Sequence, residues 1–177
     1  MINPNKKRLR RSMMFLNAQK PSLIKDPYIY KADSLMLDLE DAVAANQKDS
    51  ARFSLYHALT TIDYRGSEKV VRINGLDTDL WKEDIRCCVA GGAEVIRIPK
   101  TEDAGMVKAV EDEIIKAEKE FHRPEGFTLI MSALESAKGV MNAYEVCTSS
   151  ERMIGVALSG GDYTKDLQTR ITGTGVE

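Results

Sequence analysis

The sequence contains few of the residues that form disulfide frameworks, zinc sites or histidine-dependent catalytic triads. Only three of its 177 residues are cysteine and two are histidine. Cys87 and Cys88 are adjacent and Cys147 stands alone, and an odd count without framework spacing favours a reducing compartment. We therefore expect small core residues at these positions and a cytoplasmic location. His57 and His122 have no partner at metal-ligand or triad spacing, so we interpret both as structural.

The sequence also lacks an excess of charge of one sign and a long apolar segment. Its formal net charge is -2 and its pI about 5.8, which excludes the electrostatic footprint of a nucleic-acid-binding protein. No apolar run is long enough to cross a bilayer, and no apolar stretch follows the first residues, so we expect neither a membrane partner nor a signal peptide. The one basic cluster consists of Lys6, Lys7, Arg8, Arg10 and Arg11. We expect a solvated N-terminal arm there, with contact to an anionic ligand or a partner subunit as the alternative.

What the sequence does contain is a regular alternation of apolar runs and helical segments. Six apolar runs predict strands, namely Ser12–Leu16, Leu35–Leu39, Val70–Ile73, Val95–Ile98, Thr128–Ala133 and Ile154–Leu158. Most are continuously apolar, which is typical of strands covered on both faces. The helical segments between them are Asn46–Leu59, Leu80–Ala90, Glu102–Phe121 and Ser136–Val146. For the third helix we expect Thr101 as the N-cap and an ion pair between Asp112 and Lys116.

This alternation predicts an α/β fold with a parallel sheet and right-handed crossovers. The segment after the first strand reads LNAQKPS and lacks a glycine-rich phosphate fingerprint, which argues against a dinucleotide-binding sheet and favours a (β/α)8 TIM barrel. Such a barrel has eight strands and about 250 residues. We therefore expect residues 1–177 to form a single barrel domain that contains about the first six βα units, with the C-terminal units missing. An open sheet of six strands would expose a long hydrophobic edge.

Charged residues follow several of the predicted strands at their carboxyl ends. They are Glu40 and Asp41 after SLMLDL, Arg72 in VVRIN, Glu135 after TLIMSAL, and Asp162 after RMIGVALSGG. In a parallel β/α fold the carboxyl ends of the strands meet on one face, where active sites are built. The sequence therefore predicts a site at that face.

Glu135 and Asp162 are the best candidate pair of metal ligands. Two carboxylates without a nearby histidine or cysteine suit Mg²⁺, which usually takes one or two carboxylates and leaves its other positions to water and substrate. Gly160 and Gly161 support this interpretation because glycines allow a ligand to approach the backbone, and Gly161 is a candidate substrate-binding position. The alternative is that Glu135 and Asp162 are ordinary residues of helix starts.

Arg72 is expected to meet an anion because a lone arginine at the end of a valine-rich strand is costly. Its partner is either Glu40 or Asp41, or else a substrate carboxylate held in a bidentate fork. Glu40 and Asp41 are neighbours and cannot both point the same way on a regular strand, and either is a candidate general base. Arg97 in VIRIPK resembles Arg72 in its position. Lys100 suggests a Schiff-base aldolase, which we rank lower because nearby acids would keep its amine protonated.

Several motifs occur together and in a fixed order. They are R-R-S-M-M-F-L, L-D-L-E-D-A-V with Lys48 and Ala51-Arg52 downstream, V-V-R-I-N, R-I-P-K-T, A-L-E-S-x-x-G-V and G-G-D-Y. From about residue 8 to the end, the chain resembles the citrate lyase beta-subunit family, part of the wider citrate lyase/malyl-CoA lyase group of magnesium-dependent aldolase-like barrels. It departs from that family after F-L, where Asn17-Ala18 stands in place of the usual Pro-Gly, and the final two barrel units are absent.

The resemblance implies a (β/α)8 barrel that uses Mg²⁺ to cleave citryl thioester, carried on an acyl carrier protein, into oxaloacetate and acetyl thioester. The acyl-carrier or CoA thioester is then supplied by the substrate. By motif, Glu135 and Asp162 are the metal ligands and Arg72 is the substrate-binding arginine, while Glu40 and Asp41 line the site and order its water. The implied partners are the acyl carrier and transferase subunits of a citrate lyase complex and further copies of the chain, as a trimer or larger.

Two other functions remain open at the level of sequence. A sister lyase acting on malyl-CoA, methylmalyl-CoA or citramalyl-CoA would share the same core. A truncated barrel that serves only as an assembly subunit would lack turnover altogether.

Overall fold

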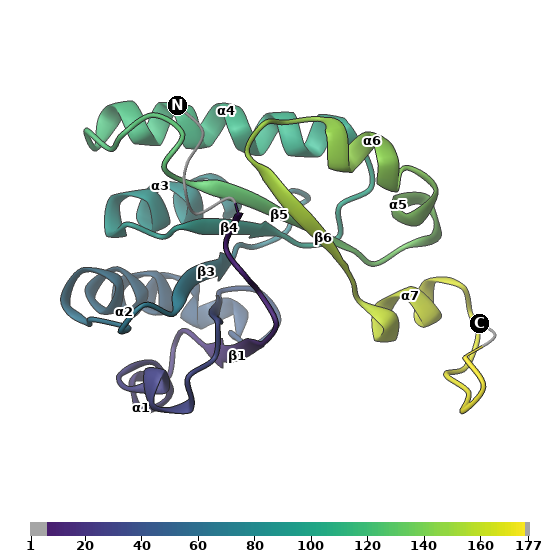
Figure 1. Ribbon diagram of the computed structural model, residues 1–177, viewed down its shortest axis with the longest axis horizontal. Coiled ribbons are helices and arrows are strands. Elements are labelled where there is room, and N and C mark those ends of the chain that lie inside the picture. The colour runs from purple at the N-terminus through teal and green to yellow at the C-terminus, as the bar shows by residue number, and fades with distance from the viewer. Residues whose placement is uncertain (1–6, 176–177) are drawn as a thin grey trace.

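The computed structural model describes residues 7–175, and these form one parallel sheet with helices (Figure 1). Its six strands are β1 (Met13–Asn17), β2 (Ser34–Asp38), β3 (Glu68–Arg72), β4 (Val95–Ile98), β5 (Leu129–Leu134) and β6 (Met153–Leu158). They follow one another in the order β1-β2-β3-β4-β5-β6, and every neighbouring pair is parallel. The predicted α/β fold with a parallel sheet is therefore confirmed, and β1 and β6 form the two edges of the described sheet.

Three long helices cover one face of this sheet. They are α2 (Lys48–Thr61), α3 (Trp81–Gly91) and α4 (Ala104–Glu120), which lie side by side in Figure 1. The shorter elements are α1 (Pro21–Ile24), α5 (Ala137–Met141), α6 (Ala143–Thr148), α7 (Gly160–Asp166) and the 3₁₀ turns η2 (Pro27–Tyr30) and η3 (Ala45–Gln47). No helix in the described part of the chain is both long enough and apolar enough to span a membrane.

Two details of the helices differ from the sequence-based expectation. The single helix expected over Ser136–Val146 is divided at Asn142, whose side-chain amide donates to the Glu102 carbonyl at 2.9 Å. The N-cap of α4 is Asp103, which accepts a hydrogen bond from the Met106 N–H at 3.1 Å, so the prediction of Thr101 was wrong. Thr101 is instead fully buried, and its hydroxyl donates to the Ile98 carbonyl. The first difference arises from a contact with the loop after β4, and the second from burial of Thr101 in that loop.

The ion pair expected between Asp112 and Lys116 is also replaced. The Lys116 amine lies 3.0 Å from the Glu113 carboxylate, one residue closer along the helix. Side chains three and four residues apart are both neighbours on a helix surface, so the sequence alone does not choose between them.

The sheet carries a hydrophobic core on each face. The larger core fills the space between the sheet and the helices and includes Leu35 and Leu37. The smaller one lies on the opposite, inner face and consists of Met36, Val70, Val95, Leu129 and Met131. Because side chains alternate along a strand, the next inward-facing positions after this inner cluster fall at the carboxyl ends of the strands. Those positions hold charged residues.

The N-terminal basic cluster is not the solvated arm that we expected. Arg10 forms a bidentate ion pair with the buried Glu68, at 2.7 and 2.5 Å, and Arg11 pairs with Asp33 at 2.8 Å. The Arg8 guanidinium bonds to the Gly66 carbonyl. A carboxylate as buried as Glu68 requires a cation, and Arg10 supplies it. Lys6 lies outside the described residues.

Candidate active site

The register of the sheet brings the predicted site residues together at the carboxyl ends of the strands. Asp38 lies opposite Arg72 across β2 and β3, and Arg72 lies opposite Arg97 across β3 and β4. Leu134 lies opposite Leu158, so Glu135 and Ser159 follow directly at neighbouring strand ends. All these positions belong to the carboxyl ends of parallel strands, as the sequence predicted.

Arg72 lies in a group of three carboxylates. Its Nε and Nη2 donate to the two Asp38 oxygens at 2.8 and 2.6 Å, and its Nη1 lies 2.9 Å from Glu40 and 4.0 Å from Asp41. Burial opposes the charged form of Arg72, but the hydrogen bonds and charge of Asp38 outweigh burial and raise the pKa of the guanidinium. The expected pairing with Glu40 is present, but the bidentate partner is Asp38, which sequence reasoning missed.

Asp38 fixes both Arg72 and the loop after β2. Besides Arg72, its carboxylate accepts the backbone N–H groups of Glu40 at 2.9 Å and Ala42 at 3.2 Å. From the other side of this loop, the Lys48 amine donates to the carbonyls of Leu39 and Glu40, both at 2.7 Å. A signal for Asp38 was present in the sequence, because residues two apart on a strand share a face and Asp38 stands two residues before Glu40.

Glu40 and Asp41 have different environments, as expected, although both lie in the loop after β2 and not on the strand itself. Glu40 is 5% exposed, whereas the Asp41 side chain is 65% exposed. One Glu40 oxygen lies 2.9 Å from Arg72 Nη1 and the other 3.1 Å from Lys100 Nζ; these are ion pairs without well-aligned hydrogen bonds. Burial raises the pKa of Glu40, although Arg72 and Lys100 both act to lower it. Glu40 is thus a buried carboxyl with a proton affinity above the usual range.

Lys100 interacts with acids from both parts of the site, namely Glu40 after β2, and Glu135 and Asp162 after β5 and β6. It lies in the loop after β4 in a left-handed conformation, with φ of 47°, which is uncommon for a residue with a side chain. The close contact with the Glu40 carboxylate raises the pKa of its amine, and the charges of Asp41 and Glu135 act in the same direction. Lys100 also helps to lower the pKa of Asp162. Lys100 is thus close enough to Glu40, Glu135 and Asp162 for its charge to act on all three.

Glu135 is a buried carboxylate without a partner. It is 6% exposed, and within residues 7–175 its side chain forms no hydrogen bond or ion pair. The next residue, Ser136, caps α5 by accepting the Gly139 N–H at 3.1 Å and donates to Glu102 at 3.0 Å. A Cβ at Gly139 would come within 2.5 Å of the Thr101 carbonyl, so the glycine lets α5 pack against the loop after β4. These contacts hold the backbone next to Glu135 in place.

Asp162 lies in the first turn of α7 and is partly exposed. Lys165 donates to one of its oxygens at 2.9 Å and Ser159 to the other at 3.0 Å, and these two hydrogen bonds lower its pKa. A Cβ added to Gly160 or Gly161 would meet no atom within 4 Å, so the space in front of this backbone is open. Asp166 at the end of α7 accepts the Ala137 N–H at 2.7 Å and thereby joins the loops that carry Asp162 and Glu135.

The donors present at this rim suit Mg²⁺. The described residues contain no cluster of three or more histidine, cysteine, aspartate or glutamate side chains that could hold a metal ion by itself. Mg²⁺ does not need such a cluster, because it usually binds one or two carboxylates and completes its shell with water and substrate oxygens. An unpaired buried carboxylate at Glu135 and an accessible one at Asp162 meet that requirement.

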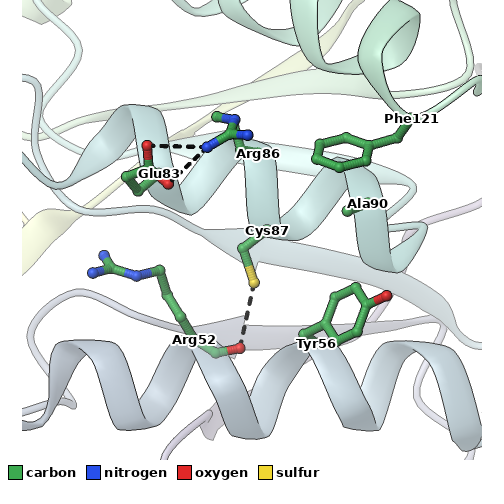
Figure 2. Close-up of a pocket in the computed structure, with 7 residues that line it drawn as sticks. All are labelled: Arg52, Tyr56, Glu83, Arg86, Cys87, Ala90 and Phe121. Atoms are coloured by element: carbon green, nitrogen blue, oxygen red, sulfur yellow. Dashed lines mark hydrogen bonds and ion pairs between the residues drawn. The ribbon is translucent and has the colours of Figure 1, made fainter.

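A separate pocket of about 610 Å³ lies on the outer helical layer, away from the strand ends (Figure 2). Arg52 and Tyr56 of α2 face Glu83, Arg86 and Cys87 of α3 across it. The Cys87 thiol lies 3.3 Å from the Arg52 carbonyl, and burial raises its pKa to about 11. A thiol that stays protonated at neutral pH is a poor nucleophile, in agreement with the structural role that we expected for Cys87. Cys88 is buried as expected, but Cys147 is exposed, so the expectation of a core residue was wrong there.

The family of the chain follows from a comparison with known proteins. A model of the family described as HpcH/HpaI aldolase/citrate lyase matches residues 11–177. The chain belongs to the HpcH/HpaI aldolase/citrate lyase family. The resemblance stated from the motifs is therefore confirmed.

Members of this family are similar to the chain in sequence and in fold. The citrate lyase subunit beta of Leuconostoc mesenteroides subsp. cremoris is 55% identical over 93% of the chain, and that of Escherichia coli K12 is 42% identical over 99%. An L-malyl-CoA/beta-methylmalyl-CoA lyase of Cereibacter sphaeroides is 32% identical over 97% of the chain. The chain spans 55 to 58% of the length of these curated relatives.

Solved structures of the family have the same fold. The Mycobacterium tuberculosis citrate lyase beta subunit complexed with oxaloacetate and magnesium is 25% identical to the chain, with a TM-score of 0.71. The match covers 97% of this chain and 68% of that protein.

Proposed function

We propose that the chain carries the active site of a carbon–carbon lyase that cleaves citryl thioester into oxaloacetate and acetyl thioester with the aid of Mg²⁺. The observation that carries the proposal is the buried, unpaired carboxylate of Glu135, beside a rim whose other buried acids are already paired with Arg72 and Lys100. The relatives called citrate lyase subunit beta are 41 to 55% identical to the chain, against 32% for the malyl-CoA lyases, which favours citryl thioester as the substrate.

The reaction requires three changes in the citryl group. Its tertiary hydroxyl loses a proton, and the bond breaks between the hydroxyl-bearing carbon and the methylene next to the thioester. The electron pair passes to the thioester carbonyl, and the resulting enolate takes up a proton to become acetyl thioester. Glu135 and Asp162 would hold Mg²⁺, which, when bound, makes the hydroxyl more acidic and orients the substrate.

The other residues of the rim bind charge and move protons. Glu40 accepts the hydroxyl proton, directly or through water, because its raised pKa makes it a better base than an exposed carboxylate. Asp41 is exposed at the edge of the site and orders water there. Arg72, held rigidly by Asp38, offers a fixed positive charge to the negative charge that develops during cleavage. The open backbone at Gly161 leaves room for substrate.

Assembly of the protein is part of the same proposal. A citrate lyase beta subunit works with acyl carrier and transferase subunits, and we propose the same partners here, together with a homo-oligomer of three or more copies. The acyl-carrier or CoA thioester would arrive with the substrate. The cytoplasmic location expected from the sequence stays a prediction.

A product assay tests this function. Purified protein is incubated with citryl thioester, and oxaloacetate is followed by its reduction to malate with NADH and malate dehydrogenase. We expect oxaloacetate to form with Mg²⁺ and not with EDTA. Glu135→Ala and Asp162→Ala are expected to abolish turnover while circular dichroism shows an unchanged fold.

Other outcomes would replace the proposal. Near-normal activity of both variants in magnesium buffer would remove the metal assignment. Release of glyoxylate from malyl thioester without turnover of citryl thioester would identify the sister lyase. Failure to bind either Mg²⁺ or a substrate analogue would identify a non-catalytic assembly subunit.

A further inference from the structure

Arg97 is a buried cation that the proposed reaction does not yet use. It follows Ile96 on β4, lies opposite Arg72 in the sheet and is 7% exposed. Its Nη1 lies 3.7 Å from the Met13 sulfur, and its guanidinium lies 5.5 Å from the centre of the Phe15 ring. Its Nε is buried and has no hydrogen-bond partner. Within residues 7–175 no carboxylate forms an ion pair with it.

This environment differs from that of Arg72. Arg72 is surrounded by Asp38, Glu40 and Asp41, and these acids raise its pKa. Burial lowers the pKa of Arg97, and the neighbouring positive charge of Arg72 lowers it further. A buried guanidinium without a carboxylate is costly, and an anion that arrives at this position would find the Nε donor free and only a weak sulfur acceptor on Nη1.

The position of Arg97 connects it with the rim. Both guanidiniums lie over the same half-exposed Phe15 ring, Arg72 at 5.6 Å and Arg97 at 5.5 Å from its centre. Arg97 is also within electrostatic reach of Glu135. In the strand order, Arg97 on β4 therefore lies between Arg72 on β3, which is already paired, and Glu135 after β5, the candidate metal ligand. It lies on the inner face of the sheet.

We propose that Arg97 binds the second carboxylate of the citryl group and thereby selects citryl over malyl and citramalyl substrates. This inference rests on the proposed function. The hydroxyl-bearing carbon of the citryl group carries a carboxylate and a carboxymethyl arm, whereas citramalyl has a methyl group and malyl a hydrogen in place of that arm. The planar fork of a guanidinium matches a carboxylate in two parallel hydrogen bonds, and a buried site strengthens both.

Binding of two 2-oxoacids tests this role without any need for turnover. Oxaloacetate and pyruvate differ by one carboxylate, and their dissociation constants are measured by calorimetry in Mg²⁺ buffer. We expect wild-type protein to bind oxaloacetate roughly 10- to 100-fold more tightly than pyruvate, the range of one charge-assisted hydrogen-bonded contact. Arg97→Met should remove this preference by weakening oxaloacetate alone. Arg97→Lys should retain part of it, because the charge remains and the fork is lost.

A matched control comes from the outer surface. Arg86 of α3 pairs with Glu83 of the same helix and with Glu120 of α4 on the outer helical layer, and Arg86→Met should leave both dissociation constants unchanged. The proposal is overturned if wild-type protein does not prefer oxaloacetate, or if Arg97→Met weakens both ligands equally or neither. A preference that disappears in Arg97→Met while citryl thioester is not cleaved supports the carboxylate site and refutes only the proposed reaction.

Discussion

The amine of Lys100 lies 3.1 Å from Glu40, and this contact decides between two chemistries. A lysine that forms a Schiff base must lose its proton, which a lowered pKa would favour. The contact with Glu40 raises the pKa of Lys100 instead. This direction agrees with the expectation that nearby acids keep the amine protonated, which favours a fixed cation over a Schiff-base lysine.

This gives a prediction for trapping experiments. Treatment of the protein with borohydride in the presence of pyruvate or oxaloacetate should leave Lys100 unmodified in peptide mass spectra. Lys100→Met should still bind Mg²⁺ but lose turnover by roughly 10- to 100-fold, because a preorganised charge near the reacting atoms is missing. A reduced adduct on Lys100 would contradict the metal-dependent account.

For single residues, the sequence predicted which charged side chains lie at the strand ends but not which of them form ion pairs. Glu40, Arg72, Glu135 and Asp162 all lie at strand ends, as their places after apolar runs indicated. Their partners depend on contacts between distant residues. The bidentate bond from Arg72 reaches 34 positions back to Asp38, and no local pattern distinguishes this partner from Glu40. For the same reason the unpaired state of Glu135 and Arg97 emerges only from the fold.

Among the elements, α4 is connected to the residue before β6 by a buried ion pair. Arg152 donates to both Glu118 oxygens at 2.9 and 2.7 Å, and Glu118 also accepts the backbone N–H groups of Gly126 and Thr128. The two side chains are 2% and 9% exposed. Each oxygen of this carboxylate accepts two hydrogen bonds. The ion pair therefore holds α4 against the strand that leads to Asp162.

Removal of one partner should destabilise the fold. Arg152→Met leaves the Glu118 carboxylate buried with two backbone donors only, and we expect the free energy of unfolding to fall by about 3 kcal/mol. The control on the same helix is Lys116→Met, which removes an exposed ion pair with Glu113 and should cost less than about 1 kcal/mol. Urea unfolding followed by circular dichroism measures both. Equal losses in the two variants would contradict the importance of burial for this ion pair.

The helices and strands were predicted well because the apolar patterns that indicate them are local in the sequence. Continuous apolar runs located all six strands to within two residues, and apolar positions at steps of three and four located α4. The division between α5 and α6 was missed because its cause is not local. Asn142 bonds to the carbonyl of Glu102, 40 residues earlier, and no propensity at Asn142 indicates that contact.

In the whole molecule, the six parallel strands place every candidate site residue at one rim and leave β1 and β6 as edges of the described sheet. The expected eight-unit barrel would pair those edges, and that expectation stays a prediction. The opposite end of the sheet is held by Arg10 with Glu68 and Arg11 with Asp33, contacts made within the chain. At the carboxyl-end rim, by contrast, Glu135 and Arg97 form no ion pair within residues 7–175.

The central claim is that the free carboxylate of Glu135 and the accessible one of Asp162 together hold a divalent ion. Calorimetric titration of Mg²⁺ into the protein in the presence of oxaloacetate tests it directly. We predict binding by wild-type protein and by the control Glu83→Gln in the outer pocket. Affinity should weaken at least roughly tenfold in both Glu135→Gln and Asp162→Asn, since each removes one charged ligand. Wild-type affinity for Mg²⁺ in both of these variants would contradict the account.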